Sequence, residues 1–166
     1  MTWTTPKTWA VDELLTAADM NEQVRDNLDY LLEPNNDSVE YDNSGDYSIT
    51  NVTTFQDVDG TNFKVTVTTH GGPILVTCNF SATNGANAVH FDLALDGVRV
   101  SAGTLGLFTL DIQAGDMGAV AIAYLIIGQS AGTYDITLQW RTASTNSATI
   151  RANSANNIAI LQAVEI

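Results

Sequence analysis

Eight segments between Phe63 and Ile166 carry the apolar spacing of β-strands. Apolar residues alternate with polar ones or run together in them, and Gly, Asn and Asp separate them. The segments read FKVTVTT, ILVTCNFSA, AVHFDLAL, VRVS, LFTLDI, GAVAIAYLII, TYDITLQW and IAILQAVEI. Between the third and fourth, Asp96-Gly97 is typical of a two-residue hairpin turn. This series predicts a mainly β fold, an antiparallel sandwich of the jelly-roll type.

Alternation also predicts which side chains face the core. One predicted inward set is Val89, Phe91, Leu93 and Leu95, opposed by His90, Asp92 and Ala94. A second is Tyr134, Ile136, Leu138 and Trp140, opposed by Asp135, Thr137, Gln139 and Arg141. We expect both strands to be half exposed, with His90 solvated on a polar face. Cys78 alternates with Ile74, Val76 and Phe80, so we expect it to be buried.

The segment GAVAIAYLII is apolar on both faces. Val120, Ile122, Tyr124 and Ile126 fall on one side, and Ala121, Ala123, Leu125 and Ile127 fall on the other. In an antiparallel sandwich only one face of a strand reaches the core, so the second apolar face is a candidate subunit interface. We therefore predict an interface at Ala121, Ala123, Leu125 and Ile127.

A single helix is predicted ahead of the strands, over roughly residues 17–32. Thr16 is a good N-cap, and Asp19, three residues on, completes a variant of the capping box. Apolar residues then recur at three- and four-residue spacing, at Met20, Val24, Leu28, Leu31 and Leu32, and Pro34 ends the pattern. So short a helix is marginal alone, so its apolar stripe must be buried on something.

Two tryptophans, Trp3 and Trp9, precede this helix on a segment with little regular pattern. Exposed tryptophans are good anchors for the pockets of a partner, although both could instead fold back on the protein's own core. The helices of several copies could also form a small coiled coil. The predicted attachment set is Trp3, Trp9, Leu15, Met20, Val24, Leu28 and Leu31.

These patterns divide the chain into three parts. Residues 1–33 form an N-terminal arm and helix. Residues 34–60 are polar and rich in turn residues, so we predict a connector with one or two short strands. Residues 61–166 form the β-sandwich.

Charge and composition disfavour several classes of function. The net charge is −13, which repels phosphate backbones and anionic lipid surfaces, so we expect neither a nucleic-acid nor a membrane partner. One cysteine cannot form an intrachain disulfide. Neither a secretory leader nor a span of ~20 apolar residues is evident, which favours synthesis in a bacterial cytoplasm.

The motifs that could carry chemistry lack their required context, so we predict no enzyme, no cofactor and no metal. Gly128-Gln129-Ser130-Ala131-Gly132 matches the nucleophile elbow of hydrolases, but a strand pattern follows it and no histidine comes later in the chain. Residues 57–62, DVDGTN, have their glycine at the wrong place for a calcium loop. His70, His90 and Cys78 lack the spacing of a zinc site.

The segment TWAVDELLTAADMNEQVRDNLDYL, residues 8–31, resembles a segment near the start of many tailed-bacteriophage virion proteins. Residues 53–166, with their FQDVDGTNFKVTVTTHGGPILVTCNFSA and closing LQAVEI, are similar to trimeric jelly rolls of the tumour-necrosis-factor and complement-head type. The resemblance implies a homotrimeric protein of the virion surface. Its N-terminal arm would be fastened to other virion proteins of the capsid, neck or tail, as in a head fibre, a capsid decoration protein or a tail fibre.

A second hypothesis is a receptor-binding module, whose loops would bind a host-surface glycan or protein. The candidate loops are residues 84–87, NGAN, and residues 144–147, STNS. They contain no aromatic residue on which a sugar could stack, which weakens this alternative.

Overall fold

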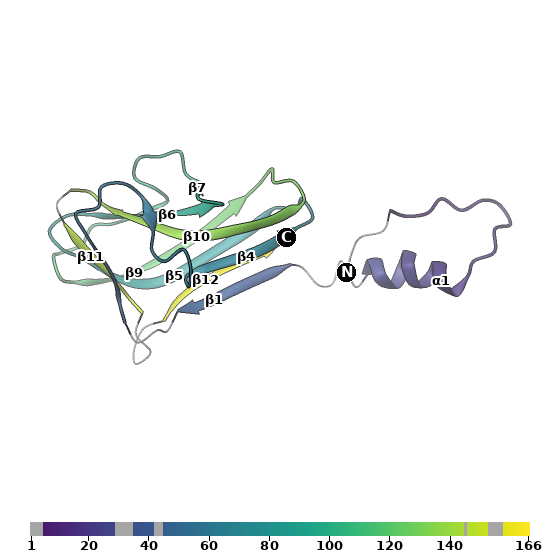
Figure 1. Ribbon diagram of the computed structural model, residues 1–166, viewed down its shortest axis with the longest axis horizontal. Coiled ribbons are helices and arrows are strands. Elements are labelled where there is room, and N and C mark those ends of the chain that lie inside the picture. The colour runs from purple at the N-terminus through teal and green to yellow at the C-terminus, as the bar shows by residue number, and fades with distance from the viewer. Residues whose placement is uncertain (1–4, 29–34, 42–44, 145, 153–157) are drawn as a thin grey trace. The chain divides into compact units, whose positions relative to one another are not determined.

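The chain divides into two compact units, Met1–Pro34 and Asn35–Ile166. The computed structural model describes residues 5–28, 35–41, 45–144, 146–152 and 158–166 (Figure 1). Within these ranges, no helix is both long and apolar enough to span a membrane. Each unit is described below by itself.

The N-terminal unit contains one short helical run, which begins where the sequence predicts. It comprises α1 (Ala17–Met20) and a π-helical turn, η1 (Asn21–Asp26). The predicted capping box is confirmed, since Thr16 Oγ1 accepts from the Asp19 N–H at 3.1 Å and the Asp19 carboxylate accepts from the Thr16 N–H at 3.2 Å. The π-helical turn differs from the regular α-helix that the spacing predicts, and the predicted last turn lies outside the described residues.

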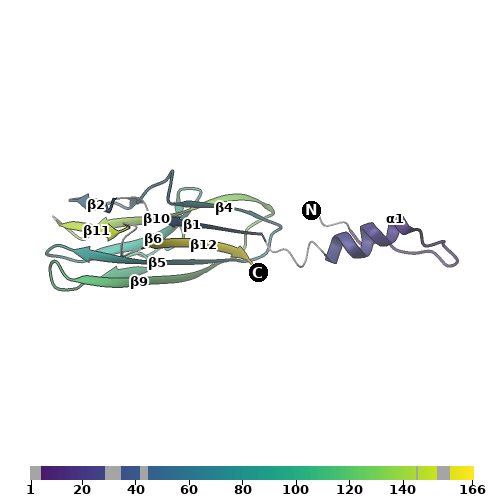
Figure 2. The same ribbon diagram turned by 90° about the horizontal axis from the view of Figure 1, so that it is seen from below.

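The first sheet of the second unit is antiparallel and wraps around one long central strand, β5 (Ile74–Asn84). One edge of β5 pairs with β9 (Met117–Ile126) along almost its whole length. The other edge pairs first with β12 (Ala159–Glu165) and then with β11 (Ser147–Arg151). Beyond these lie β1 (Asn36–Tyr41) beside β12, and β2 (Tyr47–Thr50) beside β11. In Figure 2, β1, β12, β5 and β9 follow one another in this order.

The second sheet is also antiparallel and is built around β10 (Gly132–Thr142). It pairs with β4 (Lys64–Thr69) and the short β3 (Gln56–Asp57) on one edge and with β6 (Val89–Leu95) on the other. β6 continues to β8 (Phe108–Leu110) and to β7 (Val98–Arg99). Asp96 and Gly97 between β6 and β7 both have positive φ, 48° and 76°, as the predicted hairpin turn requires.

The strand order confirms the jelly roll. The main strands run β1-β12-β5-β9 in the first sheet and β4-β10-β6-β8 in the second, so the chain repeatedly crosses between the sheets. The predicted connector, residues 34–60, contributes three strands, β1, β2 and β3, where one or two were expected. β11 was not predicted, because SATIR is too short and too polar to be recognised as a strand.

The core lies between the two sheets and follows the predicted alternation. Cys78 is fully buried, as predicted, and burial raises the pKa of its thiol. Phe91 is central: its ring lies 4.9 Å from that of Phe80 across the sandwich and 6.5 Å from that of Trp140, centre to centre. The other large side chains of the core are Phe63, Val65, Val67, Ile74, Val76, Leu93, Ile136, Leu138, Ile150 and Leu161.

The expectation that β6 and β10 are half exposed is wrong. His90, Asp92 and Ala94 on β6 are buried, as are Thr137 and Gln139 on β10. The reason is tertiary: side chains from neighbouring elements contact these polar groups, since Asp57 bonds to Thr137 and Gln139, Arg99 to Asp92, and Thr109 to His90. The predicted solvated position of His90 is therefore also wrong, because this residue is only 4% exposed.

Candidate functional site

Apolar side chains of the N-terminal unit are largely open to solvent. Trp9 is 40% exposed, Val24 42% and Leu28 51%. Leu15 and Met20 are also exposed. The remaining two members of the predicted attachment set, Trp3 and Leu31, lie outside the described residues. The described members therefore present apolar surface that a partner could cover.

Lys7 fastens the segment before the helix to the helix itself. Its backbone N–H donates to Gln23 Oε1 at 2.7 Å, and its ammonium group forms ion pairs with Glu13 and with Asp19. The same ammonium group lies 4.5 Å from the centre of the Trp9 ring, within the range of a cation–π contact. Together these groups frame a hollow of about 450 Å³, lined by Pro6, Lys7, Trp9, Glu13, Leu15, Asp19, Met20, Gln23 and Val24.

The second apolar surface lies on β9. Ala121 and Ala123 point outward and are exposed, Leu125 is 44% exposed and Ile127, just beyond the strand, is 68% exposed. Among the described residues β9 pairs with β5 alone, so its other edge is free. The strand contains neither a charged residue nor a proline, the features that normally prevent an edge strand from pairing with another chain.

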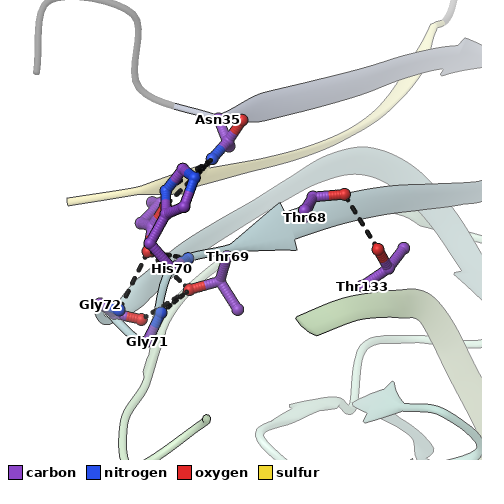
Figure 3. A network of polar contacts seen from close by, with 8 residues as sticks. Asn35, Thr68, Thr69, His70, Gly71, Gly72 and Thr133 are labelled. Carbon is purple, nitrogen blue, oxygen red and sulfur yellow. Dashed lines mark hydrogen bonds and ion pairs between the residues drawn. The ribbon is translucent and has the colours of Figure 1, made fainter. Parts of the chain in front are cut away.

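Glu165 joins the C-terminal strand to the turn between β4 and β5 and to the start of β1. Its Oε1 accepts from Thr69 Oγ1 at 2.6 Å and from the backbone N–H groups of His70 and Gly72 at 2.7 and 2.9 Å. Its Oε2 lies 3.0 Å from His70 Nδ1 and 3.2 Å from Asn35 Nδ2. Figure 3 shows Asn35 and His70 directed toward each other above Thr69 and Gly72.

Hydrogen bonds govern the ionisation of Glu165. Burial by itself raises the pKa, but the donors from Thr69, Gly72, His70 and Asn35 outweigh it and lower the pKa from 4.5 to about 2. The carboxylate is thus fully charged at neutral pH. It acts as a structural clamp at the place where the N-terminal unit joins the sandwich in the sequence.

A buried polar layer covers the outer face of the second sheet. Asp57 Oδ1 accepts from Thr137 Oγ1 at 2.9 Å and from Gln139 Nε2 at 2.8 Å, which ties β3 to β10. Asp92, with no exposed side-chain area, accepts from Arg99 Nε at 2.6 Å. These bonds satisfy polar groups that would otherwise be costly to bury.

The loops predicted to bind a receptor instead bond to each other. Asn146 Oδ1 accepts from the Ala86 N–H at 2.8 Å, and the Gly85 N–H donates to the Ser147 carbonyl at 2.7 Å. Asn84 Nδ2 donates to the carbonyls of Asn87 and Ile112. Asn84 and Asn146 are both buried, so these two amides serve the fold of the loops.

Ser130 and Asp59, two of the residues considered for chemistry, lie in loops between strands. Ser130 is exposed, and its Oγ lies 3.3 Å from the hydroxyl oxygen of Tyr134. The loop around it is not a hairpin turn, because β9 and β10 belong to different sheets. Asp59 accepts from the Thr61 and Asn62 N–H groups and from the Tyr47 hydroxyl, so its oxygens serve a turn. No cluster of three metal-binding side chains occurs in the described ranges.

Comparison with known proteins yields no family. No protein-family model matches the chain, and no curated protein matches it. The fold and its exposed surfaces define the class of protein: an antiparallel jelly-roll β-sandwich that follows a small helical unit.

Solved structures with a similar arrangement of strands include three distant ones. The infectious bursal disease virus VP2 subviral particle is 8% identical with a TM-score of 0.42, over 81% of this chain and 37% of that one. A family 35 carbohydrate-binding module from an environmental isolate is 16% identical (TM-score 0.34; 73% and 90%). Dimeric latent PorU from Porphyromonas gingivalis is 8% identical (TM-score 0.37; 80% and 13%). This chain thus spans well under half of the VP2 chain, and such low scores carry no functional argument.

Proposed function

We propose that this chain is a structural protein of a tailed-bacteriophage virion surface, held on the particle by its N-terminal unit and assembled as a homotrimer through its jelly roll. The observation that carries the proposal is the exposed apolar surface of the N-terminal unit, at Trp9, Leu15, Met20, Val24 and Leu28. A unit of some thirty residues cannot bury such a surface within itself, so a protein partner is the natural cover. The resemblance of residues 8–31 to virion proteins supports a partner on the particle.

The free edge and outward face of β9 support self-assembly. Backbone N–H and C=O groups on a free edge can pair with another chain, and the row Ala121, Ala123, Leu125 and Ile127 supplies apolar area beside them. In a cyclic trimer, three copies of this surface would be covered at once. The head, the neck and the tail of the virion all remain compatible with this proposal.

Removal of residues 1–34 is expected to abolish incorporation into particles while the sandwich stays folded. The core of the sandwich is formed by residues of its own unit, so circular dichroism of residues 35–166 should retain a cooperative β-sheet transition. Mass spectrometry of particles from the phage that carries the gene, complemented with the truncated chain, measures incorporation. Particles that still carry the truncated protein would contradict the proposal.

A point variant sharpens this test. Val24→Asp should also abolish incorporation, because an unpaired carboxylate would be buried against the partner. Leu105→Asp is the control, since Leu105 is an exposed apolar residue of the sandwich, 54% exposed. It should leave incorporation unchanged, and equal losses from both variants would argue against the N-terminal unit as the anchor.

Leu125→Glu is expected to convert the trimer to monomers at micromolar concentration. Each interface would then bury an uncompensated charge, which costs several kcal/mol. Light scattering should give three times 17.8 kDa for the native chain and 17.8 kDa for the variant. Leu105→Glu, which places the same charge on an exposed leucine outside this surface, is the control and should remain trimeric. A native mass of one chain would refute the homotrimer.

A further inference from the structure

A groove on the outer side of the second sheet gathers two of the six basic residues of this acidic chain. It is lined by Thr53, Thr54, Phe55, Arg99, Thr104 and Arg141 and is widely open to solvent, with a volume of about 480 Å³. This volume lies within the ~300–1,000 Å³ range of small-ligand sites. Sequence reasoning missed the groove, because its residues come from four separate segments.

Phe55 organises the two arginines. The guanidinium carbon of Arg99 lies 3.9 Å from the centre of the Phe55 ring, and that of Arg141 lies 5.4 Å from it. Both distances are within the range of cation–π contacts. The ring is itself wedged against the backbone of Gly106, where an added Cβ would come within 2.9 Å of Phe55 Cζ. The site is therefore built before any ligand arrives.

The two arginines differ in how their charges are balanced. Arg99 donates to the buried carboxylate of Asp92 at 2.6 Å, so that pair is neutral overall. Arg141 instead donates to main-chain carbonyls, at 2.7 Å to Thr104 and 3.5 Å to Thr142. Among the described residues, no carboxylate lies within ion-pair distance of Arg141. Its guanidinium has five N–H donors, so several remain for a ligand.

The neighbour of Arg141 across the strands does not compensate this charge. His90 lies directly opposite on β6, and its Nδ1 lies 2.9 Å from Thr109 Oγ1. Burial, and then the charge of Arg141, lower the pKa of His90, so the ring is neutral at pH 7. Arg141 thus offers an unpaired positive charge in a molecule whose net charge is −13.

The lining indicates the ligand. A guanidinium fork matches the planar geometry of a carboxylate and can bind it through two hydrogen bonds. Exposed hydroxyls of Thr53, Thr54 and Thr104 can each donate and accept, as the hydroxyls of a sugar do. A simple carboxylic acid or an acidic peptide side chain would leave these hydroxyls unused.

We propose that this groove binds an acidic sugar, with its carboxylate on Arg141 and its hydroxyls on the three threonines. The inference concerns a different surface from the attachment and assembly surfaces and does not depend on them. It also moves glycan recognition away from the loops at residues 84–87 and 144–147, where the sequence suggested it.

The test is a titration of the full ¹⁵N-labelled chain with sodium glucuronate, followed by amide chemical shifts. Saturable shifts at Thr53, Thr54, Thr104 and Arg141 are expected. Glucose, which has the hydroxyls without the carboxylate, and acetate, which has the reverse, should each bind at least tenfold more weakly. Equal binding of acetate, inorganic phosphate or a glutamate-containing peptide would overturn the proposal, as would shifts confined to other surfaces.

Arg141→Gln should weaken glucuronate binding at least tenfold. Arg25→Gln removes the same charge from the N-terminal unit and should leave the affinity unchanged. A glucuronate affinity that survives Arg141→Gln would refute the assignment, and so would an equal loss in both variants. If Arg141→Gln does not fold, the shift map of the native chain still decides, because only binding in the groove moves the threonine amides together.

Discussion

Arg99→Ala is expected to lower the free energy of unfolding by about 3–5 kcal/mol at pH 7, the cost of leaving a buried charge without its partner. Asp92 has no exposed side-chain area, and Arg99 Nε at 2.6 Å supplies its only ion pair among the described residues. The backbone N–H groups that also donate to Asp92, of Leu93 at 2.9 Å and of Ser101, cannot balance a full negative charge. Urea denaturation followed by tryptophan fluorescence measures the loss, since Trp140 lies in the core.

The pH dependence of the stability lost in Arg99→Ala identifies the cause of that loss. Burial raises the pKa of Asp92, although the hydrogen bond from Arg99 acts to lower it. Removal of the arginine should therefore raise this pKa further. A carboxyl group with a raised pKa in the folded state destabilises the fold increasingly as pH rises through that pKa. The deficit of Arg99→Ala should therefore be smaller at pH 5 than at pH 8. A deficit independent of pH would point to lost packing instead.

Two variants serve as controls. Asp92→Asn combined with Arg99→Gln removes both charges and should recover part of the lost stability. Lys64→Ala breaks the exposed pair with Asp135, whose side chain is 43% exposed, and should cost at most about 1 kcal/mol. If Lys64→Ala costs as much as Arg99→Ala, burial is not the reason for the larger effect.

Glu165→Gln is expected to remove about 2–3 kcal/mol of stability above pH 5, with the loss vanishing in acid. The pKa of Glu165 is lowered from 4.5 to about 2 in the folded chain, and its side chain is 11% exposed. A lowered pKa stabilises the fold above the unfolded value and ceases to do so as pH falls. The native chain should therefore lose this contribution between about pH 4.5 and 2.

Asp59 titrates in the same pH window, with a pKa of about 2, in both the native chain and the variant. Its contribution therefore cancels in the difference between their stabilities, which reports on Glu165 alone. Thermal unfolding at half-unit steps from pH 2 to pH 7 gives both curves. They should converge near pH 2. Glu40→Gln, an exposed carboxylate on β1, should follow the native curve throughout, and curves of Glu165→Gln that stay parallel to the native one would exclude the clamp.

Some features of the two apolar surfaces could be predicted from the sequence, and others are visible only in the tertiary structure. Alternation placed Ala121, Ala123, Leu125 and Ile127 on one face of a strand, and the structure finds that face exposed. Only the sheet order reveals that β9 also has a free edge. The helix cap at Thr16 and Asp19 could be predicted from the sequence because these two residues are only three positions apart. The π-helical turn could not be predicted, because the spacing of its apolar residues does not differ clearly from that of an α-helix.

The sequence by itself determined the β-sandwich, its inward faces and the start of its helix, because period-two alternation, turn residues and helix caps act between near neighbours in the chain. The tertiary structure alone decided that the outer face of the second sheet is covered. Asp57 bonds to Gln139, and Phe55 contacts both Arg99 and Arg141, only because segments far apart in the sequence come together at that sheet. These contacts depend on strand order and register, which the local spacing of residues does not encode.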